Sequence, residues 1–152
     1  MIVYRIAQEK YIEDLSGMGS YLYGGRWSRK GTFAIYTAQH RSLAYLEYVV
    51  HQFGQDIWPE DLKIATLEIV DSNIIILNEK NLPHMWVKVV HHVETQSVVT
   101  KAFEDGSVAI SVPSVIVKDE RNIILNPLHK DFFQKVTIRN IEPIELDDRF
   151  RV

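Results

Sequence analysis

Glu47 is the residue whose type and position most need a chemical explanation. It follows Leu43 by four residues and precedes Val50 by three, so helical spacing places it on the apolar face of a predicted helix. A carboxylate buried without a partner is costly, and one at this position needs either a cation or a chemical role. Position alone favours the structural interpretation, a buried ion pair or an edge side chain that reaches water, over the catalytic one.

A glycine-rich loop carries a second candidate, Arg26, within the segment Gly24-Gly25-Arg26-Trp27-Ser28. Glycines let a backbone approach a ligand closely, and the planar guanidinium group suits phosphate or carboxylate. The loop lacks the Gly-Lys-Ser/Thr ending of a Walker A motif, and Gly17-Met18-Gly19 follows no predicted strand, which argues against a dinucleotide fingerprint. By itself the glycine pair also fits an ordinary turn.

A third candidate, Ser114, follows Val112-Pro113, where a predicted strand breaks into a loop. Strand ends commonly carry site residues. No Gly-x-Ser-x-Gly elbow surrounds Ser114, so a hydrolase nucleophile is disfavoured and a turn-capping hydroxyl is the local interpretation. The six histidines complete no pattern such as His-Glu-x-x-His, so no metal site is predicted.

Two stretches of the chain are expected to supply helices. The first is 41–53, where apolar residues recur at spacings of 3, 4 and 3 and predict a buried stripe of Leu43, Leu46, Val50 and Phe53. The second is 84–104, which lacks Gly and Pro and is expected to be helical in part. Residues 14–31 hold five of the seven glycines and are expected to form an irregular, functional loop.

Apolar runs and alternation predict strands over much of the remaining chain. They are expected at 2–6, 32–38, 65–69, 74–77, 108–112, 115–117, 122–125, 134–141 and 144–146, with a charged hairpin turn at 118–121. The succession lacks the alternating rhythm of a doubly wound fold. It therefore predicts an α+β protein, with a mixed β-sheet core and flanking helices.

Composition narrows the function classes. The 152 residues suit a single domain, 1–152, and 46% hydrophobic with 24% charged residues is an ordinary globular composition. The absence of cysteine excludes disulfides, thiolate zinc sites, a Cys nucleophile and iron–sulfur clusters. A net charge of −3 argues against direct nucleic-acid binding. No apolar run suits a bilayer and no leader pattern is present, so a cytoplasmic protein without a membrane partner is expected.

In order along the chain, these residues resemble the RES domain family, the toxins of bacterial Xre–RES toxin–antitoxin pairs. The segments that carry the resemblance are Val3-Tyr4-Arg5-Ile6, Gly24-Gly25-Arg26-Trp27, Gly31, Tyr36-Thr37, Leu46-Glu47 with His51, Leu82-Pro83, Trp86, Val112-Pro113-Ser114, Asn122, Asn126-Pro127, His129 and Asp148-Arg149. Two departures stand out: Ser28 replaces the usual Asn, and 95–104 lacks an expected glycine. Neither touches the Arg, Glu and Ser after which the family is named.

The resemblance implies a fold similar to ADP-ribosyltransferase toxins and an activity that destroys NAD+. Members cleave the bond between nicotinamide and ribose by hydrolysis or phosphorolysis, and some attach ADP-ribose to a protein. NAD+ would be a substrate and not a cofactor, so no cofactor is expected. The implied partner is an Xre-like helix-turn-helix antitoxin, because an unrestrained enzyme of this kind would kill its host.

The resemblance also assigns roles. Arg26, Glu47 and Ser114 would be catalytic, with Glu47 stabilising the oxocarbenium-like ribose or orienting its hydroxyls. Nicotinamide leaves as a neutral base, so a single carboxylate suffices. For substrate binding, Arg5 and Arg26 would hold the diphosphate, Tyr36 would stack on nicotinamide, Ser114 would hydrogen-bond the nicotinamide ribose or amide, and Asn126 would support them. We expect Arg5, Arg26, Tyr36, Glu47 and Ser114 to line one pocket.

Three other functions are weighed against NAD+ cleavage. A protein mono-ADP-ribosyltransferase would use the same residues with a protein side chain as acceptor, so the sequence does not separate the two. A non-catalytic binding module with the same fold would be favoured if Arg26 or Glu47 were missing, and both are present. A ribonuclease is disfavoured by the acidic balance of charges.

Overall fold

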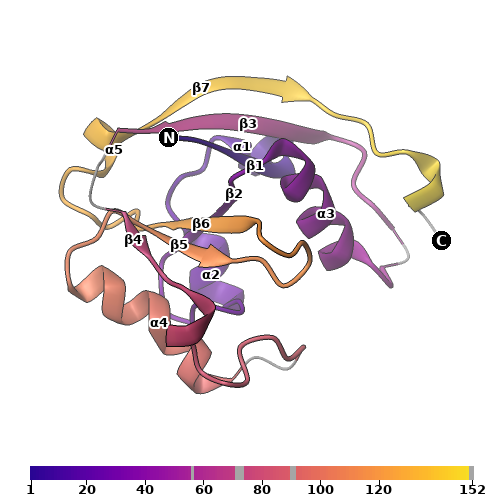
Figure 1. Ribbon diagram of the computed structural model, residues 1–152. Helices are drawn as coiled ribbons and strands as arrows, with labels where there is room; N and C mark the ends of the chain where they lie inside the picture. The colour runs from indigo at the N-terminus through magenta and orange to yellow at the C-terminus, as the bar shows by residue number, and fades with distance from the viewer. Residues whose placement is uncertain (56, 71–73, 90–91, 151–152) are drawn as a thin grey trace.

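A single mixed sheet organises the molecule. The computed structural model describes residues 1–55, 57–70, 74–89 and 92–150, and within them the strand order is β4-β5-β6-β2-β1-β3-β7 (Figure 1). All neighbours pair antiparallel except β4 and β5. The strands are β1 (Ile2–Gln8), β2 (Ile35–Ala38), β3 (Leu62–Ile69), β4 (Ile75–Ile76), β5 (Ala109–Pro113), β6 (Arg121–Leu125) and β7 (Val136–Pro143). The α+β class and the mixed sheet are thereby confirmed.

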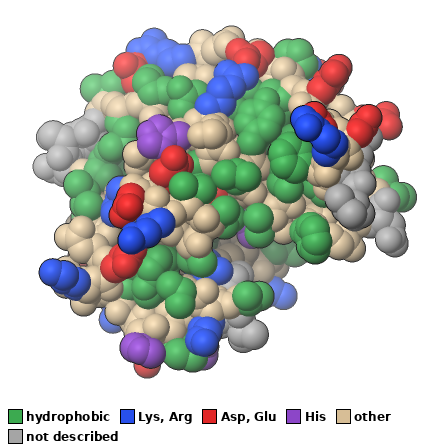
Figure 2. Space-filling model, turned by 45° about the vertical axis from the view of Figure 1, so that its right-hand side comes forward, with side chains coloured by type: hydrophobic (Ala, Val, Ile, Leu, Met, Phe, Trp, Pro, Cys, Tyr) green, Lys and Arg blue, Asp and Glu red, His purple; other side chains and the backbone are tan. Residues whose placement is uncertain are grey.

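Two longer helices flank the sheet, α3 (Arg41–Gln52) and α4 (Val93–Glu104) (Figure 1). The shorter ones are α1 (Glu9–Ile12), α2 (Met18–Tyr23), α5 (Phe132–Lys135), η1 (Glu79–Asn81) and η2 (Asp148–Phe150). Among the described residues, no helix combines the length and the apolar character that a membrane crossing requires. On the face shown in Figure 2, acidic and basic side chains are interspersed among hydrophobic ones.

Each face of the sheet has its own core, because successive side chains of a strand point to opposite faces. On one face, α3 packs Leu43 and Ala44 beside Ala38 of β2, and α4 packs Val99 beside Ile110 of β5. The opposite core is formed by residues from the strands together with α1 and α5, among them Val3, Ile12, Leu67, Ala109, Ile123 and Phe132. The two long helices therefore cover the face that carries Tyr4, Ala38 and Asn122.

The two halves of the sheet meet at a narrow point. In the described chain, β1 and β2 pair at Tyr4 and Ala38 only, whereas β1 follows β3 from Ile2 to Gln8. Beyond that pair the strands part, and residues from both line a cavity. The middle and the end of α3 complete the lining of this cavity, from Ala44 to Gln52.

The structure corrects two expectations about the helices. Residues 14–31 contain α2, which begins after Gly17 (φ 75°) and ends at Gly24 (φ 69°), so these glycines bracket a helix. In α3 the predicted buried stripe is wrong: Leu43 is buried, but Leu46, Val50 and Phe53 are exposed. The helix instead buries Leu43 and Ala44, and it packs the half-buried Tyr45, Tyr48 and Val49 against a small core around Leu62 and Ile64 of β3.

Two predicted strands are absent from the described residues. Residues 115–117 lie in the turn between β5 and β6, so the hairpin is made by those two strands. The hydroxyl of Ser114 accepts hydrogen bonds from the amides of Ile116 and Val117, which curls the chain. Residues 144–146 follow β7 outside any strand, although Ile144 donates one backbone hydrogen bond to Leu62 of β3 and both Ile144 and Leu146 are buried. The helix expected in part of 84–104 is α4, and residues 90–91 lie outside the described residues.

Candidate active site

Two adjoining cavities form a cleft beside α3. One, of about 270 Å³, lies at the gap between β1 and β2; the other, of about 470 Å³, lies between α3, the glycine-rich loop and the turn after β5. Four residues border both cavities: Tyr36, Glu47, His51 and Asn122. The larger cavity has the volume expected of a small-molecule site. Glu47 therefore faces open space from the edge of a helix and is not a core ion pair.

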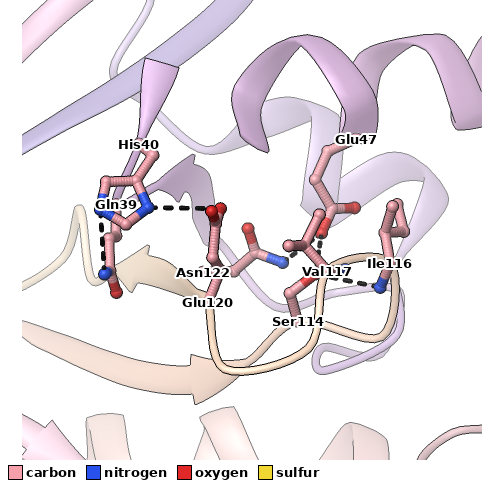
Figure 3. A network of polar contacts seen from close by, with 8 residues as sticks. All are labelled: Gln39, His40, Glu47, Ser114, Ile116, Val117, Glu120 and Asn122. Atoms are coloured by element: carbon pink, nitrogen blue, oxygen red, sulfur yellow. Dashed lines mark hydrogen bonds and ion pairs between the residues drawn. The ribbon is translucent and has the colours of Figure 1, made fainter. Parts of the chain in front are cut away.

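Glu47 accepts two hydrogen bonds at one carboxylate oxygen. Asn122 of β6 donates from Nδ2 to Oε1 at 2.5 Å, and the Ser114 hydroxyl donates to the same oxygen at 3.2 Å (Figure 3). The three residues come from α3, from β6 and from the end of β5, so sheet pairing and helix packing assemble the contact together. Glu47 and Ser114 are thus in contact, but Ser114 borders neither cavity and Arg5 and Arg26 border different ones, so the five residues expected in one pocket are divided over the cleft.

Ser114 has a fully committed hydroxyl. Its oxygen accepts from the backbone amides of Ile116 at 3.0 Å and Val117 at 3.1 Å, and its hydrogen is then directed to Glu47 (Figure 3). Ser114 is also buried. In this structure it holds the carboxylate, and the contact to the ribose or amide implied by the resemblance stays a prediction.

Arg26 borders the larger cavity from within the glycine-rich loop. Its Nη1 donates to the carbonyl oxygens of Trp86 and Lys88, both at 2.6 Å, and thereby ties the loop to the segment before α4. Burial lowers the pKa of Arg26, and the charge of Glu47 opposes that shift. No ion pair joins Arg26 to Glu47 among the described residues, so both charges remain at the cleft.

Tyr36 stands where the two cavities meet. Its hydroxyl accepts from the backbone amide of Trp27 at 3.2 Å and lies 2.8 Å from the hydroxyl of Ser28, which in turn lies 2.7 Å from that of Ser20. Burial raises the pKa of Tyr36, so the phenol is neutral and available for hydrogen bonding. Ser28, one of the departures from the family pattern, is thus the link that holds Tyr36.

Arg5 borders the smaller cavity at the gap between β1 and β2. Its Nη1 donates to the carbonyl oxygens of Ile12 at 3.0 Å and Asp14 at 2.8 Å, which fastens the end of α1 to β1. Burial lowers the pKa of Arg5, and the charge of Asp14 opposes the shift. Arg5 thus borders the smaller cavity, but its guanidinium group is held by Ile12 and Asp14.

Asn126 is not brought to the cleft. It is buried at the far end of β6, where its amide donates to the carbonyl oxygen of Ser107 and its own oxygen accepts from the amide of Leu128. These bonds shape the turn after β6 and tie it to the segment before β5. Its contribution here is to the fold, and the implied support of substrate binding stays a prediction.

Two cleft residues were named in the sequence analysis only as parts of the resemblance. His51 follows Glu47 by four residues, a helical spacing that places both on one side of α3, and this signal was available. Asn122 had no such local signal, because its contact with Glu47 joins positions 75 residues apart.

Comparison with known proteins identifies the family. The RES domain model matches residues 2–147. The chain belongs to the RES domain family. Among curated RES relatives, a protein named Toxin Res from Photorhabdus laumondii is 39% identical, with 93% of this chain and 92% of that protein covered. A Yersinia enterocolitica Toxin Res is 36% identical, with 95% and 94% covered.

Two further matches extend the comparison of this RES domain. A protein named Prs ADP-ribosylating toxin, from Sphingobium sp., is 33% identical, with 78% of this chain and 76% of that protein covered. Among solved structures, a chain of the M. tuberculosis MbcT-MbcA toxin-antitoxin complex superposes with a TM-score of 0.76 at 17% identity, covering 94% of this chain and 83% of that one. The latter likeness is one of fold.

Proposed function

We propose that this RES-domain protein is a toxin that depletes NAD+ by cleaving the bond between nicotinamide and ribose. The observation that carries the proposal is Glu47, a carboxylate at the shared border of two cavities with one oxygen held by Ser114 and Asn122. Nicotinamide leaves with the bonding electrons as a neutral base, and positive charge develops on the ribose. A fixed carboxylate in a partly enclosed site stabilises that charge.

The remaining cleft residues have complementary roles in this proposal. Arg26 supplies a cation for the diphosphate, and Tyr36 offers a ring at the junction of the cavities for nicotinamide. Water or phosphate then adds to the ribose carbon and loses a proton, which gives ADP-ribose or its phosphate ester. No step requires a resident metal or cofactor.

A specific observation favours a second candidate, protein ADP-ribosylation. The Sphingobium relative is named an ADP-ribosylating toxin. The first step would be the same, with a protein side chain as acceptor in place of water or phosphate. The identity of the acceptor therefore separates the two candidates.

The test is incubation of the purified protein with NAD+, following free nicotinamide and the ribosyl product together. We expect wild-type protein to release nicotinamide and Glu47→Gln, which keeps the shape and loses the charge, to be slower by ~10²–10³ in kcat. Glu68→Gln is the matched control, because Glu68 pairs with Arg139 away from the cleft. A Glu47→Gln variant as fast as wild type would contradict the proposal, and absence of nicotinamide release would favour a binding module.

The proposed partner is a separate, Xre-like helix-turn-helix antitoxin that covers the cleft. The structural relative is a member of a toxin-antitoxin complex. In this chain, exposed apolar side chains line the larger cavity, among them Val50, Val87 and Val115. Apolar side chains at a cleft suit a protein partner. Because this chain has a net charge of −3, contact with DNA would fall to the antitoxin.

A further inference from the structure

The carboxylate of Glu47 is held asymmetrically. Both of its hydrogen bonds end on Oε1, and within the described residues Oε2 accepts none (Figure 3). Fixing one oxygen from two directions also fixes the direction of the other. The carboxylate thus presents one defined, uncommitted oxygen at the border of the two cavities.

The shorter of the two bonds comes from Asn122, whose backbone is fixed on both sides. Asn122 lies opposite Ala38 of β2 and opposite Val112 of β5 in the sheet. Its side chain is half-buried and points to the sheet face that α3 covers. The amide therefore has a rigid support, and a donor at 2.5 Å to an ionised acceptor is a strong contact.

Without this anchor, Glu47 has an alternative partner. Arg26 and Glu47 border the same cavity, and the charge of Glu47 acts on the pKa of Arg26, although the two form no ion pair within the part of the chain described. A carboxylate released from Oε1 contacts would turn toward that cation and neutralise it. The anchor thus keeps both charges available to a substrate.

We propose that Asn122 is a positioning residue for Glu47, whose amide holds Oε1 so that Oε2 faces the ribose of bound NAD+. The inference rests on the proposed NAD+-cleaving function. Ser114 assists from the turn after β5, but Asn122 makes the shorter contact from a paired strand. Asn122 touches the carboxylate and acts on the reaction through it.

The test compares Asn122→Leu, which keeps the shape and removes the donor, with Asn122→Asp, which places a second carboxylate against Glu47. We expect Asn122→Leu to lower kcat by ~10–100-fold with KM changed by less than about threefold. Asn122→Asp should lose more, because two like charges repel at this distance. Asn140→Leu is the matched control, since Asn140 also donates from a strand to a glutamate, Glu142, away from the cleft.

Combining variants separates positioning from a structural role. In a Glu47→Gln background, Asn122→Leu should cost less than about twofold, because the residue acts only through the lost charge. An equal loss in both backgrounds, or a kcat for Asn122→Leu within about twofold of wild type, would overturn the inference. Asn122→Ala, with the same expectations, replaces Asn122→Leu if the leucine variant does not fold.

Crystal structures can test the role of Asn122 even if the proposed function is wrong. If wild-type protein releases no nicotinamide, the proposed function fails, and crystal structures of wild type and Asn122→Leu then decide the inference alone. We expect the Glu47 carboxylate to turn toward Arg26 in the variant. A carboxylate that stays in its wild-type position would overturn the proposal.

Discussion

Gly25 and Tyr36 approach one another so closely that any side chain at position 25 would displace the Tyr36 ring. A Cβ atom on Gly25 would lie 2.6 Å from Oη and 2.9 Å from Cζ of Tyr36. The ring does not swing aside freely, because its hydroxyl is bonded to Trp27 and Ser28. We expect Gly25→Ala to displace the ring at the junction of the cavities and to lower nicotinamide release at least ~10-fold, since small misplacements are costly in catalysis.

A second glycine provides the control for this prediction. A Cβ on Gly19, within α2, would meet nothing within 4 Å, and its φ is outside the left-handed region. Gly19→Ala should therefore raise the free energy of unfolding by ~0.4–1 kcal/mol, measured by urea denaturation, and leave NAD+ cleavage unchanged. Equal activity of the two alanine variants would show that the position of Tyr36 is unimportant.

At the residue scale, the sequence indicates which residues belong to the candidate site better than it indicates the hydrogen bonds among them. The roles expected for Arg26 and Glu47 came from the family resemblance, because position alone favoured a structural role for Glu47. The hydrogen bond that the Ser114 hydroxyl donates to Glu47 was not predictable from the sequence. It depends on how the turn after β5 directs two backbone amides to the Ser114 oxygen. The anchoring by Asn122 was hidden as well, since it depends on the register of β6 against β2.

At the scale of elements, the turn between α1 and α2 gives the chain a pH-dependent contact. Hydrogen bonds from the side chain and backbone of Ser16 lower the pKa of Asp14, and the charge of Arg5 adds to the shift. A lowered folded-state pKa means that Asp14 stabilises the fold above its unfolded pKa of about 3.9, and that this stabilisation is lost as pH falls through the folded value.

We therefore expect Asp14→Asn to be slightly less stable than wild type at pH 6, by well under ~1 kcal/mol because Asp14 is largely exposed. The difference should shrink as pH falls through the folded-state pKa, because protonated Asp14 resembles asparagine. Urea denaturation of both proteins at pH 6 and at a series of acidic pH values measures it. A difference that persists in acid would mean that Asn disturbs the turn for another reason.

Two predictions about the helices were wrong because they relied on apolar spacing or on glycine content alone. Apolar spacing located α3 but not its buried side, because α3 packs through Leu43 and Ala44 while Leu46, Val50 and Phe53 are exposed. Glycine content suggested an irregular loop where Gly17 and Gly24 in fact terminate a helix. The strands with alternating apolar residues were predicted well, because burial on the sheet faces imposes that period.

At the scale of the whole molecule, the proposed antitoxin and NAD+ should compete. A partner that covers the cleft would occupy the space that Arg26 and Tyr36 offer to the dinucleotide. Linkage then requires that each ligand weaken the other by the same factor. We expect ADP-ribose to bind the free protein and to bind the purified complex much more weakly, as measured by calorimetry. Equal affinity in the two samples would mean that the antitoxin acts elsewhere.

The separation of Glu47 from its donors along the chain has a consequence for synthesis. Ser114 follows Glu47 by 67 residues and Asn122 by 75. At ~5–20 residues per second, a ribosome takes roughly 4–15 s to pass from the carboxylate to Asn122. Throughout that interval the nascent chain contains Glu47 but lacks β6, the strand whose Asn122 orients the carboxylate. Under the proposed function, translation of an mRNA truncated before β6 yields an inactive fragment. The toxin becomes active only after β5 and β6 have been synthesised and have paired.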